Sequence, residues 1–286
     1  MKARCPLFPL LLILATLPAL IILAGGRTTS AVAGEAAQSK STKDLKQYND
    51  SLLIAKGVLP RLNDVLTQLS LSKEPLQDME NAQQAVAKGF SIILPKLLKG
   101  DNKHAEQLGF RTDKDTSIEK ILQNANLGDY AFPVFEVRRN DLRTFSPGTD
   151  AKLLLFYTNQ LLWPIEAGDK RVQSSLTIRF ISNDQGGTEQ KAAGTTWRPT
   201  RWGQRNLINQ LATEQEKLNK QKKEFKGFLV TIASLNLNFL GYMDNTAIKF
   251  VPLVTDRLFK KGESLSAEYV FEMLSDEAKR ADDSPR

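Results

Sequence analysis

The chain has 286 residues, of which 41% are hydrophobic and 25% are charged, with 39 basic and 32 acidic residues. This composition is that of a globular protein of one large or two small domains, and it excludes a disordered or collagen-like chain. The single cysteine and single histidine exclude an internal disulfide and a structural zinc site, which needs about four Cys or His ligands. We therefore expect no cofactor and no structural metal, and we assign no catalytic residue.

The N-terminal residues have the form of an export signal. Lys2 and Arg4 precede an apolar stretch over residues 7–24, and a polar segment then ends in the small residues Ala-Val-Ala at 31–33. This pattern predicts a signal peptide over residues 1–33 with cleavage near Ala33, and a periplasmic or secreted protein. The apolar stretch also reaches the lower limit for a membrane span, so an uncleaved inner-membrane anchor stays open.

The net charge becomes smaller once this segment is set aside. Residues 1–33 hold three basic and no acidic residues, so the net charge falls from +7 to +4. No nucleic-acid-binding motif follows, and export argues against a nucleic-acid partner. The expected partner is an envelope protein, a glycan or an anionic lipid, and the sequence leaves the oligomeric state open.

The first part of the remaining chain is predicted to be helical. Small polar residues at 34–43 suggest a flexible tether, and residues 44–127 form a helical region. Leucines three, four and seven residues apart predict a helix over 42–69, and a similar pattern that opens with Pro75 predicts a second helix over 75–98. A short connection makes the two an antiparallel hairpin, and a third helix is expected over 117–126.

From Tyr130 the apolar period drops to two, which predicts strands. The expected strands cover 131–138, 152–165, 171–182, 195–198, 228–243 and 246–254, with a helix over 204–223 and a closing helix capped by Ser264 or Ser266. The predicted fold class is α+β: an N-terminal helical hairpin followed by an antiparallel sheet meander with helices packed on one face. Residues 128–281 would form the sheet domain and 282–286 a disordered tail.

Two arrangements of the helical region remain open. The helices could pack as a partly independent unit, which we favour from the sequence, or they could cover one face of the sheet.

The strongest candidate site is a cluster of aromatic and basic residues at 197–205. It consists of Trp197, Arg198, Arg201, Trp202 and Arg205. Arginine presents a planar fork to carboxylate or phosphate, and tryptophan offers a face to a sugar ring or a cation. The cluster predicts a site for an anionic envelope component. The alternative is that both tryptophans pack in the core while the arginines extend over them into water.

Three weaker signals accompany this cluster. Basic residues at 217–226 would extend a positive strip along the helix that follows. The polar interruption at 157–160 predicts a β-bulge, and Asn236 and Asn238 beside Tyr242 could line a groove.

The sequence favours a non-enzymatic binding protein. His104 lies alone in a polar segment, so it supports neither a metal site nor a catalytic triad. A carboxylate-dependent hydrolase of an envelope polymer stays open as an alternative, because several acidic residues lie near strand ends: Asp129, Glu136, Asp141, Asp150, Glu166 and Asp169.

Overall fold

The structure is a computed structural model that describes residues 31–69, 76, 78–100, 102–111, 116–168, 171–181, 196–221 and 227–283. The chain divides into two units, residues 1–41 and residues 42–286. The apolar stretch at 7–24 and the basic residues at 222–226 lie outside the described residues. Among the helices that the structure describes, none is long and apolar enough to cross a membrane.

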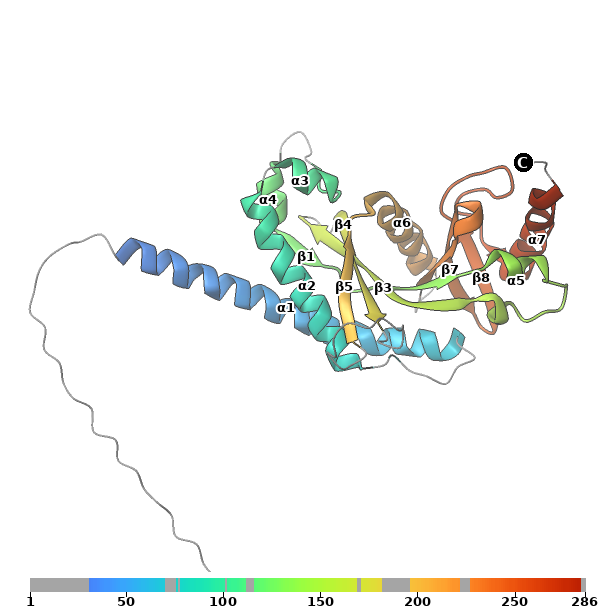
Figure 1. Cartoon of the computed structure of the whole chain (residues 1–286), viewed down its shortest axis with the longest axis horizontal. Helices are drawn as coiled ribbons and strands as arrows, with labels where there is room; N and C mark the ends of the chain where they lie inside the picture. Colours follow the sequence, from blue (N-terminus) through green and yellow to red (C-terminus); the bar gives the residue numbers. More distant parts are fainter. Residues whose placement is uncertain are drawn as a thin grey trace, which may run out of the picture. The chain divides into compact units, whose positions relative to one another are not determined.

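Four helices come first along the chain, and the strands follow with three further helices among and after them (Figure 1). The helices are α1 (Ala31–Leu69), α2 (Met79–Lys99), α3 (Asn102–Gln107), α4 (Ile118–Gln123), α5 (Arg139–Arg143), α6 (Arg205–Gln221) and α7 (Ala267–Asp283), with short 3-10 turns η1 (Ala151–Leu154) and η2 (Ala233–Leu235). The strands are β1 (Ala125–Leu127), β2 (Phe132–Glu136), β3 (Phe156–Ala167), β4 (Arg171–Ile181), β5 (Thr196–Trp202), β6 (Gly227–Ile232), β7 (Leu237–Asp244), β8 (Ala247–Pro252) and β9 (Leu265–Ser266).

Within the described residues, nine strands form one mostly antiparallel sheet, in the order β5-β4-β3-β2-β6-β7-β8-β9 with β1 paired to β3. This confirms the α+β class with two N-terminal helices. The structure differs from a pure meander at one place, where β2 and β6 pair in parallel. Parallel neighbours need a long crossover, and the chain between β2 and β6 supplies it through β3, β4, β5 and α6.

Helices cover both faces of the sheet. Side chains of a strand alternate between faces, so Leu161 and Trp163 join the larger buried cluster while Leu162 joins a smaller one. The larger cluster holds apolar residues of α1, α2, α4 and α7, whereas the smaller cluster holds Ile208, Leu211 and Leu218 of α6. The sequence predicted helices on one face of the sheet, and the structure has α6 on the opposite face as well.

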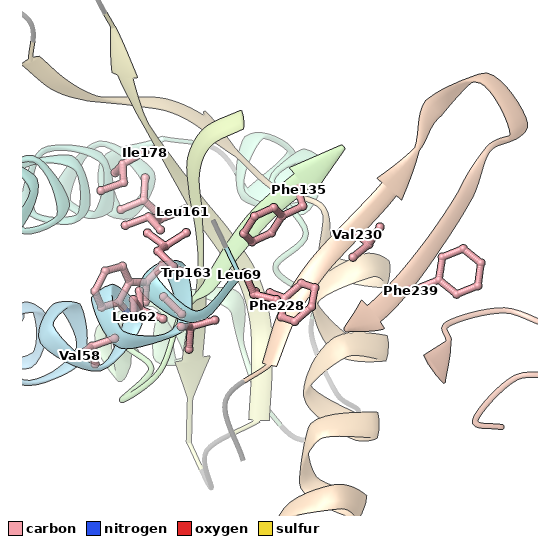
Figure 2. Close-up of a cluster of buried hydrophobic side chains, with 14 of the residues drawn as sticks. Val58, Leu62, Leu69, Phe135, Leu161, Trp163, Ile178, Phe228, Val230 and Phe239 are labelled. Atoms are coloured by element: carbon pink, nitrogen blue, oxygen red, sulfur yellow. The ribbon is translucent and has the colours of Figure 1, made fainter. Parts of the chain in front are cut away.

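Helix α1 shares the core of the sheet. Figure 2 shows Val58 and Leu62 of α1 beside Trp163 of β3, with Leu69 next to Phe228 of β6. These side chains are almost fully buried. Of the two arrangements that the sequence left open, the structure has the one in which the helices cover a face of the sheet. Residues 42–286 form one compact unit.

Several element boundaries differ from the sequence predictions. Helix α1 begins at Ala31, so residues 34–43, expected as a tether, lie within it. The strand expected over 228–243 is two strands, because η2 and a left-handed Asn236 turn the chain between β6 and β7. Helix α7 continues to Asp283, into the expected tail, and Ser266 caps its first turn by accepting from the Tyr269 N–H.

A partly buried tyrosine in β3, whose hydroxyl oxygen is buried, supplies a first testable prediction. The Tyr157 hydroxyl has no hydrogen-bond partner in the described part of the chain, and burial raises its pKa well above the ordinary value of 10.0. We expect Tyr157→Phe to raise the free energy of unfolding by about 1 kcal/mol, because an unpaired buried hydroxyl is removed. Above pH 10 the unfolded chain ionises before the folded one, so wild-type stability falls with rising pH, and it falls less in the variant. Urea unfolding at neutral and alkaline pH measures both effects, and a less stable Tyr157→Phe at both would contradict the assignment.

Candidate functional site: an arginine-lined groove

The two tryptophans of the 197–205 cluster belong to the core. Trp197 is 3% exposed and its ring lies 5.5 Å from that of Phe180. Trp202 stacks on Phe90 of α2 with a ring separation of 6.0 Å and an interplanar angle of 8°. Trp197 is therefore part of the core, and Trp202 is partly buried against it, so both follow the alternative of core packing.

Helix α2 also holds β5 in place from outside the sheet. A Cβ atom on Gly89 would come within 2.7 Å of Pro199, so the missing side chain permits the close approach of α2 to β5. The Asn81 Oδ1 atom accepts from the Trp197 N–H at 2.6 Å and from the Thr196 hydroxyl at 2.7 Å. The strand is thus fixed and its arginines have a defined direction.

The three arginines of the cluster separate in the structure. Arg205 begins α6 and donates from Nη1 to the Gly109 carbonyl at 3.1 Å. Arg198 and Arg201 remain on β5, where they are exposed. In the antiparallel register Arg198 lies opposite Arg179 of β4, and Arg201 lies opposite Thr177. In the structure, Arg179 therefore joins Arg198 and Arg201 in place of Arg205. The sequence did not single out Arg179.

Arg179, Arg201 and Thr177 line a polar hollow of about 510 Å³ on the α6 face of the sheet, and Arg198 lies opposite Arg179 on β5. We call it the Arg groove and define it by eight polar residues from five strands: Glu136, Thr158, Gln160, Thr177, Arg179, Thr200, Arg201 and Asn238. The volume lies in the range of small-molecule sites. With neighbouring strands about 4.8 Å apart, the sheet order from β5 to β7 spans roughly 24 Å.

Positive charge gathers at one end of the Arg groove. Arg198 and Arg179 are directly opposite each other, an arrangement that is destabilising for like charges. Arg201 lies on the same face, and no ion pair joins any of the three to a carboxylate of the described residues. Glu136 is the acidic side chain that lines the groove, two strands away from β4. The N-terminal end of α6, which carries no acidic residue in its first turn, adds positive potential beside Gln204.

Two irregularities of the sheet open this groove. The register moves from Pro133↔Leu161 to Phe135↔Tyr157, which confirms the bulge predicted at 157–160 and places Thr158 and Gln160 in the wall. A second shift leaves Thr200 as the extra residue of β5. Bulges of this kind re-aim side chains and recur beside functional sites.

The weaker signals of the sequence, namely the asparagines, the basic run and His104, lie in different parts of the structure. Asn238 lines the Arg groove, whereas Asn236 lies in a turn and Tyr242 is buried with its hydroxyl 2.7 Å from Ser264 Oγ. In the basic run, Lys217 pairs with Glu214 and Lys220 pairs with Glu216, so these two lysines are ion-paired on α6. His104 is exposed on α3.

Comparison with known proteins adds no further information on function, since no family model, curated protein or solved structure matches the chain.

Proposed function

We propose that this chain is an exported, non-enzymatic binding protein that holds a phosphate- or carboxylate-bearing envelope component in the Arg groove. The observation that carries the proposal is that Arg179 and Arg201 line a polar hollow, while Arg198 lies directly opposite Arg179 on the neighbouring strand. Three guanidinium groups that have no carboxylate partner in the described part of the chain are an unfavourable arrangement, which a bound anion would make favourable.

The rest of the groove suggests what the rest of the ligand is like. Gln160 presents an amide directly opposite Arg179, Thr158 and Asn238 present a hydroxyl and an amide farther along the sheet, and apolar residues such as Leu162 and Leu229 form part of the floor. Such a surface suits a polar molecule with an anionic group at one end. Glu136 on β2, in the middle of the groove, disfavours a second anionic group there, because like charges repel.

Removing the charges of Arg179 and Arg201 tests the proposal. We expect Arg179→Gln with Arg201→Gln to weaken the binding of pyrophosphate or citrate roughly 30-fold at low salt, since about 1 kcal/mol is lost for each exposed guanidinium. Isothermal titration calorimetry measures the affinity. Added salt should weaken wild-type binding more than binding to the variant. Co-sedimentation with phosphatidylglycerol vesicles asks whether a lipid headgroup supplies the anion.

Matched variants make this test specific. Arg111→Gln with Lys88→Gln removes the same charge at exposed positions outside the groove and should leave the affinity unchanged. Glu136→Gln should strengthen binding several-fold by removing the opposing charge. Equal losses in both double variants would show a general charge effect instead of a site. A collapsed melting temperature in Arg179→Gln/Arg201→Gln with retained affinity would show that the arginines are structural.

Export is proposed from residues 1–33 alone, and N-terminal sequencing of the chain from its native source distinguishes cleavage near Ala33 from an uncleaved anchor.

The hydrolase alternative finds less support in the groove, because Glu136 is its one lining carboxylate among the described residues. Glycoside hydrolysis needs two such groups across one cleft.

A further inference from the structure

A second hollow, of about 580 Å³, lies along the other side of α6 and shares no lining residue with the Arg groove. Its walls come from the start of β4, from the turn before β2 and from the polar face of α6. We call it the Gln173 pocket after the residue on which the inference depends.

Gln173 is placed in this pocket by a β-bulge. The pairing of β3 with β4 moves from Ile165↔Ser174 to Glu166↔Val172, so Gln173 is an extra residue on β4 without a partner on β3. Its side chain is 5% exposed, and its Oε1 atom has no hydrogen-bond partner in the described chain. A buried, unpaired amide oxygen costs about 1–3 kcal/mol of stability, so it is conspicuous in the wall of a pocket.

The other walls combine groups of opposite hydrogen-bonding character. Asp129 and Glu216 only accept, Arg171 and Arg205 only donate, and the amide of Asn209 does both. A simple anion would be repelled by the carboxylates, and a simple cation by the guanidinium groups. A hydroxyl group both donates and accepts hydrogen bonds, so a polyhydroxyl ligand can bond to all of these groups.

Gln173 and Tyr130 agree with the same ligand chemistry. The Gln173 oxygen is itself buried, so the side chain must turn slightly toward the pocket before a ligand hydroxyl can donate to it. A hydroxyl would serve equally well as acceptor if the amide turned to present its NH2 group. Burial, and then the charges of Glu166, Asp129 and Glu216, raise the pKa of Tyr130, so its phenol stays neutral and both donates and accepts. The Tyr130 ring is held edge-on against Phe132, with centroids 5.5 Å apart.

We propose that the Gln173 pocket is a saccharide-binding site, in which ligand hydroxyls bond to the Gln173 amide and to the acidic, basic and amide groups around it. The pocket is polar, open and concave, as a site for a sugar unit requires. This inference is independent of the Arg groove, because the two hollows use different residues.

The test is titration of the full-length protein with N-acetylglucosamine, chitotriose and maltotriose, followed by saturation-transfer-difference NMR and calorimetry. We expect at least one of these sugars to bind the wild-type protein. Gln173→Leu should then weaken that binding at least tenfold without lowering the melting temperature, because it replaces an unpaired buried amide with an apolar group of similar size.

Two further variants complete the design. Gln84→Leu makes the same substitution at an exposed position of α2 and should bind the sugar like the wild type. Asn209→Ala, on the α6 wall, should also weaken binding, which keeps the test decisive if Gln173→Leu does not fold. The proposal is overturned if no sugar of the set binds at millimolar concentration. It is also overturned if Gln173→Leu and Asn209→Ala both bind with the wild-type affinity.

Discussion

Replacing Trp163 with alanine should lower the free energy of unfolding by about 3–5 kcal/mol, the usual cost of deleting a large aromatic side chain from a core. Trp163 is 0% exposed and lies in the larger buried cluster with Val58 and Leu62 of α1. Its indole Nε1 donates to the Gly128 carbonyl at 2.8 Å. Alanine would therefore leave both a cavity and an unpaired buried carbonyl, and urea unfolding measures their combined cost.

Two companion variants separate the parts of this effect. Trp163→Phe keeps most of the packing and loses the hydrogen bond, so it should cost about 1–2 kcal/mol. Leu153→Ala, at an apolar side chain that is 61% exposed, should change stability by no more than about 0.5 kcal/mol. Because Trp163 joins α1 to the sheet, Trp163→Ala should shift one cooperative transition. Separate transitions for the helices and the sheet would contradict the shared core.

The sequence predicted the class of fold because its strongest signals are local. Leucine spacings in α1 follow directly from which face of the helix is buried, and the β-branched and aromatic residues of β3 and β4 are typical of strands, here buried on both faces. The connection of β2 to β6 in parallel could not be predicted, because it depends on pairing between segments about 95 residues apart. The docking of α1 on the sheet is also non-local, since an apolar stripe does not say which surface will cover it.

The Arg groove was predicted only in part, for the same reason. Arg198 and Arg201 stood out because they are close in sequence, and the bulge at 157–160 was visible as a polar interruption. Arg179 belongs to the same group only through the register of β4 with β5. The tryptophans drew attention through their chemistry, but Phe90 and Phe180 bury them, and no local pattern indicates those contacts. Gln173 was missed because a single extra residue in a strand leaves no compositional signal.

A second large effect is expected where β6 pairs with β7. Gly241 lies directly opposite Phe228, and a Cβ atom at Gly241 would come within 3.0 Å of three atoms of the Phe228 ring. The ring is 0% exposed and packs edge-on against Phe135, with centroids 5.3 Å apart, so it has no room to move. Gly241→Ala should therefore cost about 2–3 kcal/mol, within the usual range for an overpacked core.

A control substitution whose expected change in the free energy of unfolding has the opposite sign distinguishes this clash from a general effect of replacing glycine. Gly57 is exposed within α1, and a Cβ atom there meets no neighbour closer than 3.9 Å. Gly57→Ala should thus stabilise the protein by up to about 1 kcal/mol, because alanine favours a helix more than glycine does.

A double-mutant cycle tests whether the Phe228 ring occupies the space over Gly241. Phe228→Leu removes part of the ring and destabilises the protein by itself, but it makes space beside Gly241. In the Phe228→Leu background, Gly241→Ala should cost at least about 1 kcal/mol less than in the wild type, since residues in contact show coupling of this size. An equal cost in both backgrounds would mean that the ring does not occupy the space over Gly241. The β6–β7 register would then be wrong, and so would the position of Asn238 at the far end of the Arg groove, because Asn238 is set by the same pairing.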